Sequence, residues 1–256
     1  MAFTIDRVIR MTAEVVGNHK YPNGSEMFSD GDILFTVKDV QDASLSTSSE
    51  LEEAVDGQGN VINQYLRSKT AEWSGNNALF DFGMAAAQYG DKVVVSNATI
   101  QKCEVVEVAA NGSSATLASN LKANSTNYKV YNIDKDGMTL GDKVANATIN
   151  ANKVAGLPVD SSAAKKYFVK YDVEVSNATK IENRADAAMI PFKLTVEALG
   201  NDTCTKNTSY LYITAPYAKM SPDFDWSVAT DGTHDFTINC MKDYCGNEGL
   251  FTVIKA

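Results

Sequence analysis

The residues best suited to chemistry are two histidines and four cysteines, because imidazole and thiolate groups act as metal ligands, bases and nucleophiles. His19 and His234 lie far apart, each among polar, turn-forming residues, and neither has cysteine or carboxylate partners at metal-ligand spacing. We therefore expect both to be solvated turn residues. Cys240 and Cys245 are close enough in sequence for a thiol or metal pair. The alternating pattern instead favours Cys240 in a strand and Cys245 in the following turn.

The acidic residues and glycines provide no further catalytic or metal-binding pattern. The segment that begins at Asp134 starts like a calcium loop, but the twelfth position is Ala145 instead of glutamate, which favours a tight turn. There is no Gly-x-Ser-x-Gly nucleophile turn, no phosphate-binding Gly-Lys-Ser/Thr loop and no dinucleotide fingerprint. The sequence therefore predicts a protein that is not an enzyme, with no cofactor and no metal.

Composition restricts the classes of partner. The chain has 256 residues and a formal net charge of −9, and an acidic surface disfavours specific nucleic-acid binding but allows DNA to slide past. No run of eighteen apolar residues is present, and the N-terminal segment 1–7 lacks the pattern of a secretion signal. We expect no membrane association and assembly in a cytoplasm.

Alternating runs identify the chain as mainly β. Residues 167–175 place tyrosines and valines on one side and mostly charged residues on the other, and residues 190–198 repeat this period of two. Turn residues recur at short intervals between such runs, which is typical of a β-sandwich or partial barrel. Shorter strands are expected at 92–96, 103–108, 127–133, 209–214, 235–240 and 250–254.

The middle of the chain differs in composition, being poor in aromatic residues and rich in Ala, Asn, Ser and Thr. We predict that residues 96–165 form a small β insertion on the surface of the main domain. Residues 1–95 then supply an N-terminal segment, a hairpin and a helix, and residues 166–256 supply the strands that complete the main domain.

One segment, residues 77–89, has the composition of a helix. Asn76 or Asn77 is the expected N-cap, and Gly90 stands where a glycine stop is expected. Gly83 weakens a helix interior, which indicates close approach of a neighbouring backbone. The side chains expected to pack on a sheet are Leu79, Phe82, Ala86 and Tyr89.

The segment 33–73 predicts a long protruding hairpin. Two β-compatible arms, 33–48 and 61–73, flank an acidic, turn-rich stretch at 50–60. Such arms would reach about 45 Å, which exceeds the width of one domain. A lone two-stranded ribbon is marginal in water and its free edges invite pairing, so we predict that neighbouring copies complete it. The residues expected to make these contacts are Leu45, Val61, Ile62, Tyr65 and Leu66.

Two blocks of sequence follow the order hairpin, helix and closing strands. The first contains Val40-Gln-Asp-Ala-Ser-Leu, Gly59-Asn-Val-Ile-Asn-Gln-Tyr and Ala78-Leu-Phe-Asp-Phe-Gly-Met, and the second contains Ala215-Pro-Tyr-Ala-Lys-Met and Asp243-Tyr-Cys-Gly. In this order the chain resembles the tail tube (major tail) proteins of tailed bacteriophages. The resemblance implies a β-sandwich with a flanking helix and a long hairpin, whose copies close into hexameric rings that stack into a tube.

The same resemblance implies roles for acidic residues and a set of partners. The channel of such a tube is acidic, so DNA passes through it without being captured. The residues expected to face the lumen are Asp39, Asp42 and Glu72. Those expected in a ring-stacking loop, or else in an ordinary solvated loop, are Glu50, Glu52, Glu53 and Asp56. The implied partners are further copies, sheath, baseplate or tail terminator proteins and double-stranded DNA in transit, and the implied location is the virion tail.

Two other classes are alternatives: another virion structural protein, such as a capsid decoration protein, and a bacterial β-sandwich binding module. The missing export signal counts against the binding module. Trp73 and Trp226 are isolated in the sequence and form no aromatic platform.

Overall fold

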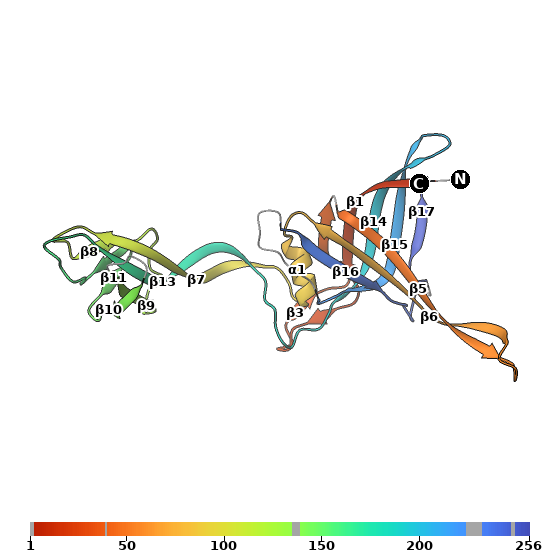
Figure 1. Cartoon of the computed structure of the whole chain (residues 1–256), viewed down its shortest axis with the longest axis horizontal. Helices are drawn as coiled ribbons and strands as arrows, with labels where there is room; N and C mark the ends of the chain where they lie inside the picture. Colours follow the sequence, from red (N-terminus) through yellow and green to blue (C-terminus); the bar gives the residue numbers. More distant parts are fainter. Residues whose placement is uncertain (1–2, 39, 135–138, 224–231, 247–248) are drawn as a thin grey trace. The chain divides into compact units, whose positions relative to one another are not determined.

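The computed structural model describes residues 3–38, 40–134, 139–223, 232–246 and 249–256 (Figure 1). These residues form a mainly β protein with one helix, as predicted. The chain divides into two compact units: unit 1 comprises Met1–Val93 and Ile181–Ala256, and unit 2 comprises Val94–Lys180.

Unit 1 is built on one eight-stranded sheet with the order β4-β1-β14-β15-β16-β6-β5, to which β17 adds by pairing with β15. Its strands are β1 (Phe3–Val15), β4 (Ile33–Lys38), β5 (Gln41–Val55), β6 (Val61–Asn77), β14 (Pro191–Asp202), β15 (Thr208–Met220), β16 (His234–Cys240) and β17 (Thr252–Lys255). A separate two-stranded ladder joins β2 (His19–Lys20) to β3 (Glu26–Phe28). Every described neighbouring pair in the large sheet is antiparallel.

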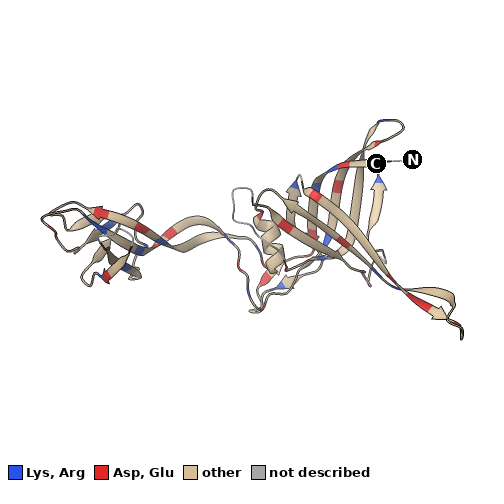
Figure 2. Ribbon diagram, viewed as in Figure 1, with Lys and Arg blue, Asp and Glu red and all other residues tan. Residues whose placement is uncertain are grey.

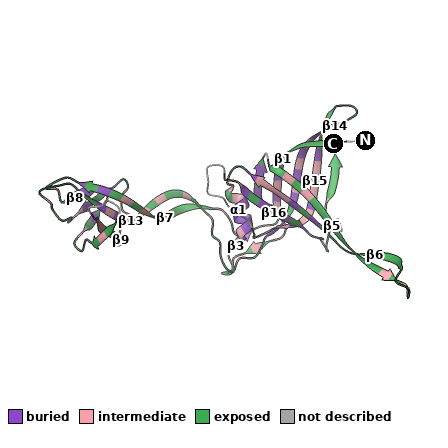
Figure 3. Ribbon diagram, viewed as in Figure 1, coloured by how far each residue is buried: buried purple, intermediate pink, exposed green. Residues whose placement is uncertain are grey.

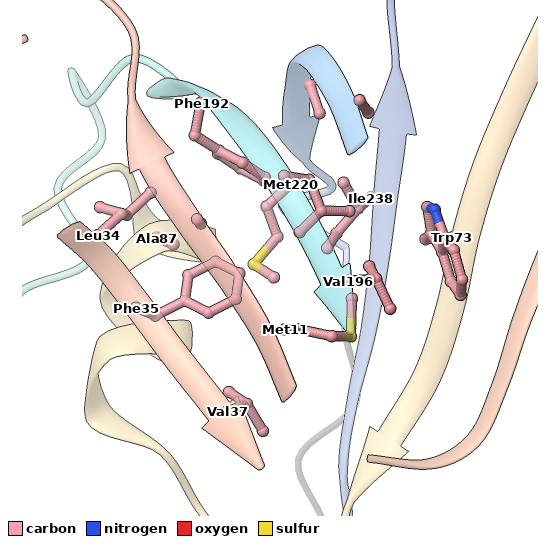
Figure 4. Close-up of a cluster of buried hydrophobic side chains, with 14 of the residues drawn as sticks. Met11, Leu34, Phe35, Val37, Trp73, Ala87, Phe192, Val196, Met220 and Ile238 are labelled. Atoms are coloured by element: carbon pink, nitrogen blue, oxygen red, sulfur yellow. The ribbon is translucent and has the colours of Figure 1, made fainter. Parts of the chain in front are cut away.

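One face of this sheet carries the core of unit 1. In β14 the period of two predicted for residues 190–198 is confirmed, with Phe192, Leu194 and Val196 fully buried. Side chains from β1, β4, β6, β14, β15 and β16 converge on the same region (Figure 4), where the Phe35 and Phe192 rings meet edge to face at 5.8 Å. The face is a continuous apolar surface, because each strand contributes alternate residues to it.

The helix is shorter than the sequence indicated. Helix α1 spans Phe82–Tyr89 and is capped by Asp81, whose side chain accepts a hydrogen bond from the Met84 backbone N–H at 2.7 Å. The predicted caps Asn76 and Asn77 are wrong, because β6 continues through both residues to pair with β16. Gly90 ends the helix with φ 67°, as predicted.

The buried face of α1 also differs from the prediction. Met84 and Ala85–Gln88 are buried, whereas Leu79 is 75% exposed and Phe82 43% exposed. The role predicted for Gly83 is confirmed, since a Cβ there would lie 3.3 Å from the Leu34 carbonyl oxygen of β4. The helix therefore packs on β4 through its small residues.

Unit 2 is a small sandwich of two sheets. One sheet has the order β10-β9-β13-β7 and the other β11-β12-β8. The strands are β7 (Val94–Val108), β8 (Ser114–Thr116), β9 (Tyr128–Ile133), β10 (Leu140–Lys143), β11 (Thr148–Asn150), β12 (Lys153–Ala155) and β13 (Lys165–Lys180). Tyr167, Val169 and Tyr171 of β13 are fully buried between the sheets, which confirms the alternation predicted for 167–175.

The extent of this unit differs from the predicted insertion 96–165. Strand β13 pairs with β7 from Lys165 to Lys180 and with β9 over Tyr167–Tyr171, and it lies in unit 2, so residues 166–180 do not join the main sheet. The two strands expected at 92–96 and 103–108 are parts of the single strand β7. Long-range pairing, which sequence periodicity does not reveal, fixes this boundary.

Candidate assembly surface

Strands β5 and β6 form a long hairpin (Figure 1), but its first arm begins at Gln41 and not at residue 33 as predicted, because Ile33–Lys38 form β4 and pair with β1. The antiparallel register of β5 and β6 runs from Gln41↔Asn76 at the base to Val55↔Val61 at the tip. The turn between them comprises Asp56–Asn60. Only residues Ala71–Asn77 of β6 pair with β16, so the distal part of the hairpin projects from the sheet.

Asp56 organises the tip. Its carboxylate accepts hydrogen bonds from the backbone N–H groups of Gln58 at 2.8 Å and Asn60 at 2.9 Å, and from the Asn60 amide at 3.2 Å. These bonds, led by the one from the Asn60 backbone, lower the pKa of Asp56 because they stabilise its charged form. The tip is therefore an ordered turn that carries a fixed negative charge.

Both outer edges of the projecting hairpin lack a strand partner among the described residues. β5 is the last strand of the sheet and pairs with β6 alone. β6 has no second partner over residues 61–70, a length of about 33 Å at ~3.3 Å per residue. Unpaired N–H and C=O groups along two edges form a template for strands of another chain.

The register divides the hairpin into two faces, because residues opposite each other in an antiparallel pair point to the same side. One face, here the apolar face, begins at Leu45 and the buried Trp73 and so continues the core face of the sheet. Further out it carries Leu51, Val55, Val61 and Leu66, with exposed fractions of 54%, 57%, 49% and 51%, and the pairs Ser49–Lys69 and Glu53–Gln64 alternate with them. Figure 3 shows the same change, from a partly buried base to an exposed arm. An apolar face this exposed is incomplete in the single chain.

The other face, here the acidic face, carries Glu50, Glu52 and Glu72 among hydroxyl side chains. Figure 2 marks acidic residues along the hairpin in red. The serines and threonine of the acidic face are Ser44, Ser46, Ser48, Ser68, Thr70 and Ser74. Arg67, at a bulge in β6, lies 3.3 Å from Glu50 in an exposed ion pair. Sequence reasoning missed the separation of the two faces, because bulges shift the register three times along the hairpin.

The predicted assembly residues are divided between these features. Val61 and Leu66 lie on the apolar face, Leu45 packs half-buried at its base, and Tyr65 lies on the acidic face opposite Glu52. Ile62 falls at a bulge and is 69% exposed. The sequence prediction did not include Leu51 and Val55. Both lie an even number of residues from Leu45, and this spacing could have placed them on the same face of the strand.

The acidic residues predicted to lie together in a stacking loop occupy different parts of the hairpin. Glu50, Glu52 and Glu53 do not lie in a loop, because β5 extends through Val55, and of that set Asp56 alone lies in the turn. Glu53 is on the apolar face, where its carboxylate accepts a hydrogen bond from the Gln64 amide at 2.7 Å.

Of the predicted lumen residues, Glu72 lies on the acidic face. Asp42 sits at an irregular step in β5 with φ 49° and accepts a hydrogen bond from the Asn76 amide at 3.1 Å. Asp39 lies outside the described residues.

A groove of about 640 Å³ lies beside β6 where this strand projects beyond β16. Its lining comprises residues 66–70 of β6, residues 47–49 of β5, Lys242 and residues 249–251. Leu66, Leu250 and Phe251 give the groove apolar contacts next to the free edge of β6. A strand added to that edge would enter this groove.

The histidines and cysteines singled out in the sequence occupy the following places in the structure. His234 is buried, not solvated as predicted, and its Nε2 lies 2.7 Å from the Gln88 side-chain oxygen. Cys240 lies in β16 and Cys245 beyond it, as predicted; Cys240 is buried, Cys245 is exposed, and both are free thiols. No group of three metal-ligating side chains, and no helix able to cross a membrane, occurs among the described residues.

Comparison with known proteins agrees with a structural assembly protein. No curated protein matches the chain. The model of the YomU/Tube protein family matches residues 26–251, a span that includes the hairpin, the helix, all of unit 2 and most of the closing strands. The chain therefore belongs to the YomU/Tube protein family.

Proposed function

We propose that this protein is the structural subunit of a phage tail tube, and that its copies form stacked hexameric rings around an acidic channel that conducts DNA during ejection. Family membership supports a structural phage protein that is not an enzyme. The number of copies in each ring and the DNA channel rest on the resemblance to tail tube proteins.

One observation carries the proposal: the projecting hairpin is unfinished in the single chain. Both of its outer edges lack strand partners among the described residues, and its apolar face stays about half exposed. Hydrogen bonding to a neighbouring copy would pair the edges, and packing against that copy would cover the leucines and valines. The two outer strands of the sheet, β4 and β5, differ from each other, so joining unlike edges would be a head-to-tail contact of the kind that closes rings.

The two faces of the hairpin suit the two sides of a tube wall. The acidic face, with Glu50, Glu52 and Glu72, would face the channel and repel DNA phosphates. Glu50 and Glu52 thereby join Glu72 as lumen residues in place of the stacking role that the sequence suggested. Of the four acids expected in a stacking loop, Asp56 lies at the ordered tip and would contact the next ring.

Sheath, baseplate or tail terminator proteins would contact the ends and outer surface of the tube. The subunit would assemble in the host cytoplasm and reside in the virion tail.

A truncated hairpin tests the proposal. Replacing residues 50–68 with Asn-Gly joins Ser49 to Lys69, which are opposite each other in the register, through a two-residue turn that suits a hairpin. The removed residues are exposed apart from the half-buried Ala54 and Asp56, so the variant should unfold at the temperature of the wild type. In negative-stain electron microscopy we expect rings or tubes from the wild type and monomers from the variant.

A matched deletion outside the hairpin controls for loss of mass. Val94 and Lys180 are paired neighbours at the base of unit 2, so an Asn-Gly turn can replace residues 95–179. This variant should still form tubes. Tubes from the truncated hairpin, or a wild type that stays monomeric at every concentration, would refute the proposal.

A further inference from the structure

The charge of the chain is divided unevenly between its units. Unit 2 has ten lysines and eight acidic residues, a net charge of +2, whereas unit 1 has 13 basic and 24 acidic residues, a net charge of −11. An anionic ligand would therefore be repelled by unit 1 and accepted by unit 2.

The outer face of the β10-β9-β13-β7 sheet carries an apolar row. Val105, Phe168 and Tyr131 are direct neighbours in the register of β7, β13 and β9. They point away from the core, because the adjacent residues Val106, Tyr167 and Val130 are buried. Val105 is 55% exposed, and Phe168 and Tyr131 are half-buried. Three strands place these side chains along about 10 Å, at ~4.8 Å per strand.

Lysines flank this apolar row. Lys170 and Lys129 are paired neighbours one step along the strands, about 6.6 Å from the row. Lys143 lies opposite Tyr131 on β10. None of these three lysines forms an ion pair with a described residue.

Three acidic residues share this face, Glu107, Asp172 and Glu174, and the exposed Glu174 accepts a hydrogen bond from the Asn97 amide at 3.4 Å. Glu107 lies opposite Lys166 in the register, and Asp172 accepts two hydrogen bonds from the Asn127 amide, both at 3.0 Å. The face therefore combines unpaired positive charge with a narrow apolar surface.

We propose that this face of unit 2 binds a linear acidic polysaccharide, laid across the strands along the Val105–Phe168–Tyr131 row. The apolar row would contact the C–H faces of successive sugar rings, which follow one another at close to the spacing of adjacent strands. Lys129, Lys143 and Lys170 would pair with the carboxylates, sulfates or phosphates at the sides of the polymer.

The make-up of the row favours a polysaccharide over a nucleic acid. Bases stack on exposed aromatic faces, but Phe168 and Tyr131 are half-buried and the most exposed member, Val105, is aliphatic. Binding by unit 2 is also separable from assembly, because no strand of unit 1 pairs with a strand of unit 2 in the described sheets.

Binding of the full-length protein to polygalacturonate, which has one carboxylate per ring, tests this proposal. Dextran serves as the neutral probe and a single-stranded oligonucleotide of equal charge as the nucleic-acid probe. By biolayer interferometry we expect polygalacturonate to bind in a salt-sensitive manner and more tightly than either comparison probe. Reversing the charge of one flanking lysine, Lys129→Glu, should raise the Kd about tenfold, as for charges that meet an oppositely charged partner.

Lys153→Glu is the matched control, because Lys153 is an exposed strand lysine on the other sheet of unit 2. It should change the Kd less than twofold, and the deletion of residues 95–179 should abolish binding. The proposal is overturned if dextran binds equally well, if the oligonucleotide binds more tightly, or if the two lysine variants lose affinity equally. Binding of polygalacturonate to the deletion variant would also overturn it.

Discussion

Removing the exposed leucines of the hairpin should weaken assembly without weakening the fold. In the double variant Leu51→Thr/Leu66→Thr the leucines, which face each other on the apolar face, become polar but keep strong β propensity. Because both are about half exposed in the single chain, the free energy of unfolding of the protomer should change by less than about 0.5 kcal/mol.

The expected cost to assembly follows from the area still exposed. Full burial of a leucine side chain contributes about 1.5–3 kcal/mol, so covering the exposed half of each should contribute about 1 kcal/mol. Two leucines give about 2 kcal/mol for each hairpin, or about 30-fold in the association constant of one contact.

Sedimentation of the polymer over a concentration series measures this effect as a rise in the critical concentration. Leu79→Thr is the control, because Leu79 is an equally apolar, exposed residue outside the hairpin. An unchanged critical concentration in the double variant, or an equal rise in the control, would show that the apolar face is not buried between copies.

Three further predictions concern the fold of unit 1. Phe192→Ala removes a fully buried ring from the core and should lower the free energy of unfolding by about 3–5 kcal/mol in urea titration; a loss below about 1 kcal/mol would contradict the packing described. Asp81→Ala removes the cap on the Met84 N–H and should cost about 1 kcal/mol, with Asp81→Asn restoring most of the loss in thermal melts. Burial lowers the pKa of His234 below the unfolded value of ~6.5. The negative charges of Asp81 and Asp235 oppose this shift only in part. As the pH falls, the unfolded state therefore binds this proton before the folded state does, so the free energy of unfolding should be highest above about pH 7 and decrease as the pH drops through 6.5. In the His234→Gln variant the free energy of unfolding should decrease less between pH 7.5 and 5.5. An equal decrease in the variant and the wild type would refute this assignment.

The helix shows where sequence reasoning reached its limit. Gly90 ends α1 as predicted, because its left-handed φ of 67° is a local requirement that glycine meets without strain. The start was mispredicted because Asn76 and Asn77 are held in β6 by pairing with β16, some 160 residues later in the chain. Local propensity was overruled there by long-range hydrogen bonding.

The sequence by itself determined the mainly β class, the buried alternation of β13 and β14, and the presence of a long hairpin within residues 33–73. Each of these depends on a period of two or on turn residues, which are local properties of the chain. The tertiary structure alone decided that residues 166–180 belong to unit 2, that His234 is buried, and that the hairpin separates into an apolar and an acidic face. Those outcomes depend on which distant strands pair and on where bulges shift the register by one residue, and a shift of one residue moves every later side chain to the opposite face.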